Sequence, residues 1–272
     1  MRTAPNWREI QADLPPLDQL GQRASGTVVV DNRSSFVRRH PTPTGAVFVK
    51  VYEYMTWRDR LRSLGRRTAP WTQPRPVREF DALQWLRRQG FHAPSPLFAG
   101  ASRQWGFLAR AILITDAWPG KAADIVLPNL ETAERNALAD AIRTLLRALH
   151  ARGFRDRNFD LRNVLVHRAD DGWRVAKIDS PRHRLVRPGV RHDRLARADW
   201  QRLEAQLANW SKAPTCSRRR CHGTRAARVR RFAVGTEPTT AGESVDSSRR
   251  HSPRIDGEPP DAQAPAGRRR RP

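Results

Sequence analysis

The sequence of 272 residues is poor in cysteine, tyrosine and lysine, and it contains no long apolar run. Two cysteines, Cys216 and Cys221, are too few for a disulfide scaffold. A zinc site is also not expected, because no second ligand pair at zinc spacing accompanies these cysteines and the neighbouring His222. The best apolar stretch, residues 111–114, is far shorter than the ~18 residues that a membrane-spanning helix needs. Residues 1–9 lack the charged-then-apolar pattern of a signal peptide. We therefore expect a cytoplasmic protein that touches membranes only at their surface.

Acidic residues are also scarce, because 51 basic residues face 27 acidic ones and the net charge is +24. The basic residues are almost all arginine, and only four are lysine: Lys50, Lys121, Lys177 and Lys212. A lysine is thus not the default basic residue of this chain, and each of the four is a candidate for a specific role.

The composition changes sharply after Trp210. Residues 211–272 contain 15 basic and 6 acidic residues, no leucine and no tryptophan. This segment cannot bury enough apolar surface to offset its ordering entropy, so we predict a disordered, arginine-rich tail. Such a tail suits nucleic acid or another anionic surface, or it is simply solvated, and we favour the solvated tail. Without it the body still carries a net charge of +15, which predicts an anionic partner.

The body begins with strand patterns and continues with helical ones. β-Branched and aromatic residues predict strands at 26–31, 35–39 and 46–54, and two or three more within 97–115. Apolar residues at helical spacing predict helices at 77–89, 131–152 and 194–210. The expected architecture is α+β, with an N-terminal extension (1–25), a small β-rich lobe (26–118), a short helical lobe (119–210) and the tail.

A hairpin is predicted late in the helical lobe, where two apolar runs flank Asp170-Asp171-Gly172. A turn centred on residues 171–172 places Asn163 opposite Ser180 and beside Asp179. An amide and a carboxylate oxygen suit Mg²⁺, which takes few protein oxygens and leaves its other positions to phosphate and water. Asn163 and Asp179 are therefore candidate metal ligands, and a hairpin with polar ends and no metal is the alternative.

The order of segments around this hairpin carries a resemblance. A helix ending Leu149-His150 leads into Asp156-Arg157-Asn158-Phe159-Asp160-Leu161-Arg162-Asn163, and the hairpin then leads to Lys177-Ile178-Asp179. This order resembles the H-R-D-x-x-x-x-N catalytic loop and the D-F-G segment of the protein-kinase-like fold. It more closely resembles the bacterial lipopolysaccharide core kinases, which phosphorylate Kdo or heptose sugars. Supporting residues are Lys50 in AVFVKVYEY, Arg78-Glu79-Phe80, and GFHAPSP at 90–96.

The resemblance implies a two-lobed, protein-kinase-like fold and a role for each matching residue. Lys50 would neutralise the phosphates of ATP, and Glu79 would pair with Lys50. Asn163 and Asp179 would hold Mg²⁺ against those phosphates. The alternatives are an edge-strand lysine in solvent for Lys50 and, for Glu79, a first-turn carboxylate that complements the helix dipole.

Three departures from the kinase pattern concern the chemistry. Asn158 stands where kinases have the catalytic aspartate, and an amide positions a hydroxyl but cannot accept its proton. Asp156 and Asp160 flank that position, and we favour Asp160 because it lies inside the loop. Ile178-Asp179-Ser180-Pro181 replaces D-F-G, which keeps the metal-binding aspartate. No glycine-rich phosphate loop is present, and residues 31–35 stand in its place.

The function that the resemblance implies is ATP-dependent phosphoryl transfer to a sugar hydroxyl of lipopolysaccharide core. The expected partner is an anionic glycolipid, lipopolysaccharide core or a lipid A precursor, met by a monomer at the inner membrane with no specific nucleic acid. Two alternatives stay open. One is a catalytically impaired pseudokinase that binds nucleotide or anionic glycolipid, and the other is an arginine-rich nucleic-acid-binding protein.

Overall fold

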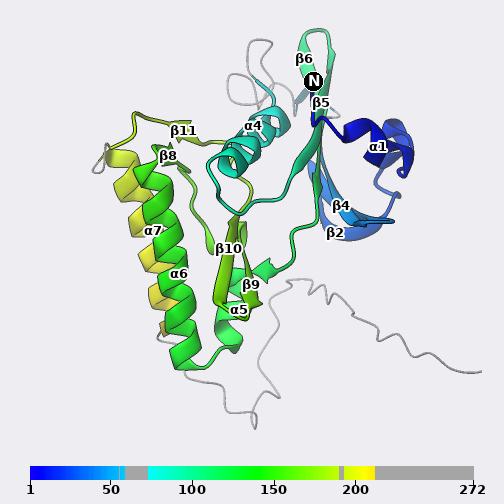
Figure 1. Ribbon diagram of the computed structural model, residues 1–272. Helices are drawn as coiled ribbons and strands as arrows, with labels where there is room; N and C mark the ends of the chain where they lie inside the picture. Colours follow the sequence, from blue (N-terminus) through cyan, green and yellow to red (C-terminus); the bar gives the residue numbers. More distant parts are fainter. Residues whose placement is uncertain (55, 59–72, 190–192, 212–272) are drawn as a thin grey trace, which may run out of the picture. The chain divides into compact units, whose positions relative to one another are not determined.

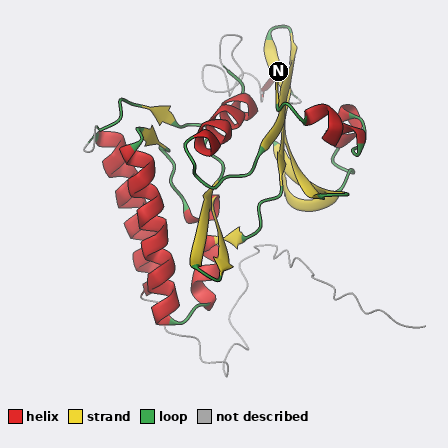
Figure 2. Ribbon diagram, viewed as in Figure 1, coloured by secondary structure: helices red, strands yellow, loops and turns green. Residues whose placement is uncertain are grey.

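A computed structural model describes residues 1–54, 56–58, 73–189 and 193–211 of the chain, whose elements are shown in Figures 1 and 2. The chain divides into two compact units, 1–227 and 228–272, and every described residue belongs to the first. Apart from Ser211, the predicted tail lies outside the described residues, as do Cys216, Cys221 and His222. Within the described ranges, no helix is both long and apolar enough to cross a membrane.

The first lobe is built on a six-stranded antiparallel sheet of order β1-β5-β6-β4-β3-β2. Its strands are β1 (Arg2–Thr3), β2 (Thr27–Asn32), β3 (Ser35–Thr42), β4 (Gly45–Glu53), β5 (Pro96–Gln104) and β6 (Phe107–Asp116). The strand predictions are confirmed, and the region 97–115 forms two strands rather than three. The apolar strand β4 lies between β3 and β6, where Lys50 is paired with Val37 and Leu113.

Side chains of β4 alternate between the two faces of the sheet, as strand geometry requires. Val47, Val49 and Val51 pack in a core with residues of the N-terminal helices α1 (Trp7–Ala12) and α2 (Leu17–Leu20). Helix α4 (Arg75–Arg88) packs against the sheet through Val77 and Phe80, which meet Ala99 and Leu113. Lys50 therefore projects to the face of the sheet that α4 covers.

The N-terminal residues 1–25 pack against the sheet of this lobe. Trp7, Leu14 and Leu20 are buried in the same cluster as Phe36 and Ile114. Strand β1 also joins the sheet edge beside β5. Helices of six and four residues are too short to produce the apolar periodicity that identifies longer helices in a sequence, so this packing escaped prediction.

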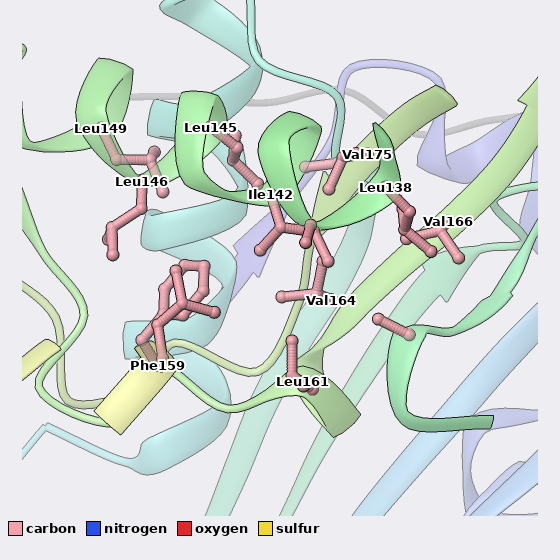
Figure 3. Packing of buried hydrophobic residues seen from close by; sticks show 14 of the residues in the cluster. Leu138, Ile142, Leu145, Leu146, Leu149, Phe159, Leu161, Val164, Val166 and Val175 are labelled. Atoms are coloured by element: carbon pink, nitrogen blue, oxygen red, sulfur yellow. The ribbon is translucent and has the colours of Figure 1, made fainter. Parts of the chain in front are cut away.

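The second lobe combines two long helices with short strands. It contains β7 (Lys121–Ala122), α5 (Ala123–Val126), η1 (Leu127–Asn129), α6 (Thr132–Ala151), β8 (Phe154–Arg155), η2 (Leu161–Asn163), β9 (Val164–Ala169), β10 (Gly172–Lys177), β11 (Arg184–Leu185) and α7 (Arg194–Ser211). Strands β10, β9 and β7 form one small sheet, and β11 pairs with β8. Figure 3 shows the leucines of α6 facing Phe159, Leu161 and Val164, so the main core of this lobe lies under the segment that precedes β9.

The β9–β10 hairpin differs from its predicted register by two residues. Ala169 pairs with Gly172, so Asp170 and Asp171 form the turn and Gly172, with a φ of 125°, already begins the second strand. The predicted pairing of Asn163 with Ser180 is therefore wrong, and Ile178 N instead donates to Asn163 O at 3.0 Å. The shift keeps Asp179 at the same end of the hairpin as Asn163, because Asp179 directly follows Ile178 in the chain.

Candidate active site

Lys50 lies between two carboxylates that come from different parts of the chain. Its Nζ is 3.1 Å from Glu79 Oε2 on α4 and 2.6 Å from Asp179 Oδ1, which follows β10. The Lys50 and Asp179 side chains are each 21% exposed and that of Glu79 is 5% exposed. The structure thus brings together three residues that the sequence analysis selected from segments 29 and 129 positions apart.

The charges of these three side chains depend on one another. Burial alone would lower the pKa of the Lys50 ammonium, but the negative charges of Glu79 and Asp179 raise it above its usual value. Burial would likewise raise the pKa of Asp179, yet Lys50 and Arg75 hold it well below its usual range. Burial raises the pKa of the Glu79 carboxyl, and Lys50 opposes that shift. Lys50 and Asp179 are consequently both ionised at neutral pH.

Arg75 and Tyr52 complete this group, and the sequence analysis missed both. Arg75 Nη2 lies 3.3 Å from Asp179 Oδ1, and its guanidinium is 5.1 Å from the centroid of the Tyr52 ring. Burial raises the pKa of Tyr52 to about 12, so its ring stays neutral. Two spacings could have revealed them: Tyr52 follows Lys50 by two positions on the same face of β4, and Arg75 precedes Glu79 by one helical turn.

Asn163 and Asp179 lie together where the β9–β10 hairpin ends. Asp179 adopts a left-handed φ of 53°, which turns the chain away from β10. The Asn163 side chain is half-buried and makes no hydrogen bond with any described residue. An amide oxygen and a carboxylate fit a Mg²⁺ ion that phosphates and water complete. Among the described residues, no group of three or more His, Cys, Asp or Glu side chains is arranged to hold a metal.

The loop of residues 156–163, which we call the 156–163 loop, is anchored by its apolar residues. Phe159 and Leu161 are buried and point towards α6 in Figure 3. Asn158 and Asp160, the polar residues that alternate with them, are half-buried. The anchors therefore fix the loop on the core and leave the side chains of Asn158 and Asp160 partly exposed.

Asp160, the residue favoured as proton acceptor, is held by its neighbour Arg162. Arg162 Nε donates to Asp160 Oδ1 at 3.0 Å, Nη2 donates to Oδ2 at 2.8 Å, and the Arg162 backbone N–H adds a third bond at 3.0 Å. These hydrogen bonds lower the pKa of Asp160 below its ordinary value. Asp160 is thus an ionised but weakly basic carboxylate, and its side chain remains 15% exposed.

Asp156 and Asn158 occupy contrasting environments. Asp156 is 1% exposed, and Lys177 Nζ lies 3.2 Å from its Oδ2. Burial raises the pKa of Asp156, and the charge of Lys177 opposes the rise. Asn158 Oδ1 accepts a hydrogen bond from Arg202 Nη1 of α7 at 3.2 Å. Asp156 therefore belongs to the interior of the lobe, whereas Asn158 lies at its surface.

Asp199 of α7 fixes the start of the 156–163 loop and was not identified from the sequence. Its Oδ2 accepts a hydrogen bond from the Asp156 backbone N–H at 3.1 Å and lies 3.3 Å from His150 Nε2. Asp199 is 1% exposed. The sequence could have revealed it, because Asp199 lies four positions before Leu203 and therefore on the apolar face of the predicted helix, where a carboxylate is unusual. Lys177 carried a comparable signal, because it is one of only four lysines.

Arg23 holds the β2–β3 turn, which stands where kinases have a glycine-rich loop. Its Nη1 and Nη2 donate to the carbonyl oxygens of Asn32 and Arg33 at 3.1 and 2.9 Å, and its Nε donates to Glu53 at 3.0 Å. Arg23 also pairs with Asp31. The turn is thus fixed by a guanidinium from the N-terminal region, which explains how it keeps a defined conformation without glycine.

The architecture and the site together define a two-lobed, protein-kinase-like protein. Among solved structures, the chain is similar to one titled "WaaP in complex with acyl carrier protein", with a TM-score of 0.50. The sequence identity is 16%, and the alignment covers 79% of this chain and 90% of that chain. At this identity the likeness speaks for the fold alone. No curated protein matches the chain.

The family follows from the sequence comparison. Residues 26–221 match the model of the lipopolysaccharide kinase (Kdo/WaaP) family, which is most of the chain. The protein belongs to this family of lipopolysaccharide kinases. The resemblance inferred from the order of motifs is therefore confirmed, and the N-terminal segment that packs on the sheet precedes the matched region.

Proposed function

We propose that this protein transfers the γ-phosphoryl group of ATP to a hydroxyl of a Kdo or heptose residue in lipopolysaccharide core. One observation carries the proposal: Lys50, Glu79 and Asp179 meet within 3.1 Å although three separate segments supply them. A half-buried lysine between two carboxylates is an arrangement typical of functional sites, because perturbed ionisable groups gather there.

Each side chain has a role that its surroundings permit. Lys50 binds the phosphates of the donor nucleotide, and Glu79 holds the ammonium in place from α4. Asn163 and Asp179 would hold Mg²⁺, which when bound would neutralise charge that develops on the phosphates. Arg75 stays beside Asp179 and keeps that carboxylate ionised, since it holds the pKa of Asp179 down together with Lys50.

The acceptor hydroxyl meets the 156–163 loop. Asn158 orients the hydroxyl through its amide, and Asp160 accepts the proton. Asp156 is unsuited to that step because it is buried and paired with Lys177. A weak base is sufficient, since positioning and charge stabilisation supply most of the rate in a loose phosphoryl-transfer transition state and the proton leaves late.

The proposed acceptor indicates the cellular location of the protein. A lipopolysaccharide core or lipid A precursor is an anionic glycolipid of the inner membrane, and a chain of net charge +24 is attracted to such a surface. We propose a cytoplasmic protein in peripheral contact with that membrane.

A pseudokinase is the second candidate, and Asn158 at the position of the usual catalytic aspartate is the observation that favours it. Such a protein would keep the nucleotide site and lose turnover. The nucleic-acid alternative depends on the arginine-rich tail, which lies outside the described residues.

The deciding experiment has two parts. The melting temperature is first measured with and without ATP and Mg²⁺ for the wild type and Asp179→Ala, and only the wild type is expected to be stabilised. Transfer of labelled phosphate from ATP to purified core oligosaccharide is then measured. Binding with transfer supports the kinase, binding without transfer supports the pseudokinase, and absence of binding overturns both.

A further inference from the structure

Three arginines from separate segments surround the surface beside this site. Arg78 lies on α4 one turn beyond Arg75, and Arg75 contacts Asp179 at 3.3 Å. Arg182 follows Asp179 by three residues. Arg157 lies in the 156–163 loop, directly after Asp156. The contact between α4 and the segment after β10 thus brings Arg78 near Arg182.

An aromatic contact brings the remaining arginine to the same place. The ring of His183, the residue next to Arg182, stacks on Phe154 with centroids 5.2 Å apart and an interplanar angle of 2°. Phe154 begins β8, and Arg157 lies two residues after the end of that strand. Strand β11, just after His183, also pairs with β8. Arg157 and Arg182 are therefore carried by two segments that pack together.

None of these three guanidiniums has an acidic partner in the described part of the chain. Nearby arginines do form ion pairs, namely Arg75 with Asp179, Arg155 with Asp193, and Arg162 with Asp160. Arg78 is half-buried, and its pKa is lowered by that burial and by the charges of Arg157, Arg182 and Arg75. Arg157 and Arg182 are exposed, so they can reach a ligand at the surface, and an anion bound there would offset the repulsion that the half-buried Arg78 experiences.

Two features of the backbone strengthen the positive potential there. Helix α4 has no acidic residue in its first turn, so its positive N-terminal end is not neutralised by its own sequence. Arg157 adopts a left-handed φ of 62°, and Arg202 Nη1 donates to its carbonyl oxygen at 3.3 Å. Backbone strain of this kind in a non-glycine residue persists where the surroundings enforce it, and it gathers at ligand sites.

We propose that Arg78, Arg157 and Arg182 form a subsite for a phosphate group carried by the acceptor glycolipid. Guanidinium groups match phosphate oxygens through paired, charge-assisted hydrogen bonds. In the proposed function, Lys50 and the Asn163–Asp179 pair bind the phosphates of the donor nucleotide, so the three arginines are not needed for those phosphates. The subsite adjoins the loop that meets the acceptor hydroxyl, so this inference rests on the proposed function and refines it to an acceptor that is already phosphorylated.

The test compares two forms of one acceptor. Deacylated core oligosaccharide is prepared with its phosphates and after their enzymatic removal, and binding of each to the full-length chain is measured by calorimetry. Wild type is expected to bind the phosphorylated form at least about 10-fold more tightly. Arg78→Ala and Arg182→Ala should each reduce that preference severalfold. Arg88→Ala, at the exposed far end of the same helix, is the matched control and should keep it.

Two further measurements separate the possible sources of failure. Inorganic phosphate at millimolar concentration should compete with the phosphorylated oligosaccharide for the wild type but not for Arg78→Ala. If both oligosaccharides bind wild type equally while ATP–Mg²⁺ still stabilises the protein, the subsite is wrong and the kinase proposal stands. If ATP–Mg²⁺ has no effect, the proposed function fails whatever the oligosaccharides do. If Arg88→Ala lost the preference for the phosphorylated oligosaccharide to the same extent, that preference could not be assigned to Arg78 and Arg182.

Discussion

The two sides of the candidate site differ in how they relate to the kinase pattern. On the donor side, Lys50, Glu79 and Asp179 match that pattern and form a closed set of ion pairs. In the 156–163 loop, Asn158 replaces an aspartate and Asp160 is bound by Arg162. Under the proposed function, this chain keeps the charge-neutralising residues of the kinase pattern and has a different residue at the position of the proton acceptor.

The physical basis of that contrast is the nature of phosphoryl transfer. Charge on the transferred group must be met by fixed opposite charges throughout the reaction, whereas the acceptor proton moves late. A strand, a helix and a hairpin end hold the donor side, and each is tied to a buried core. The variants below alter one side at a time, and they are ordered by the size of the expected effect.

Asp179→Asn should have the largest effect. It removes the proposed metal ligand and leaves Lys50 and Arg75 without their shared carboxylate, so we expect phosphoryl transfer to fall about 10³-fold. The rate of ATP-dependent labelling of core oligosaccharide measures it. Asp171→Asn, an exposed turn residue of the same hairpin, is the control and should leave the rate unchanged. A rate loss below tenfold for Asp179→Asn would contradict its proposed role.

Lys50→Met should reduce the rate by about 10²-fold, because one positive group that meets the donor phosphates is lost. We expect the KM for ATP to rise as well, since the ammonium contacts the ground state. Lys121→Met, at an exposed lysine, provides the comparison. If the KM for ATP and the rate were unchanged in Lys50→Met, Lys50 would not belong to the site that binds the donor nucleotide.

Asp160→Asn should lower the rate by about 10²-fold, the lower end of the usual contribution of a general base. Asp156→Asn should act on stability instead, because it breaks the buried pair with Lys177 and costs about 3 kcal/mol of unfolding free energy. Steady-state rates and denaturant unfolding distinguish the two variants. A larger rate loss in a folded Asp156→Asn protein would reverse the assignment.

Asn158→Asp should change the rate by less than about tenfold, and an increase is the expected direction. A new carboxylate at this position adds a proton acceptor but loses none of the contacts that hold the loop on the core. The measurement is the same transfer assay over a range of pH. Complete loss of activity would show that the amide itself is required.

Removal of residues 212–272 should have the smallest effect. Their composition offers almost no apolar surface to bury, so we expect the melting temperature and the transfer rate with soluble oligosaccharide to stay as in the full chain. A marked fall in melting temperature would show that the tail contributes to the core.

The local sequence pattern by itself determined most of the secondary structure and the family. Apolar periodicity and β-branched runs predicted the long strands and helices, including β4 with Lys50 and the helix that carries Glu79. The predicted hairpin selected Asn163 and Asp179, and the order of motifs then indicated the family. These features are readable because each depends on residues close together in the chain or on a fixed spacing.

Only the tertiary structure decided which distant residues complete the site. Arg75 reaches Asp179 across 104 positions, and Asp199 holds the Asp156 backbone from α7, 43 positions away. The packing of Trp7 on the sheet and the grouping of Arg78, Arg157 and Arg182 are of the same kind. No local spacing encodes such contacts, because they form only when the buried faces of separate elements pack and fix where charged side chains emerge.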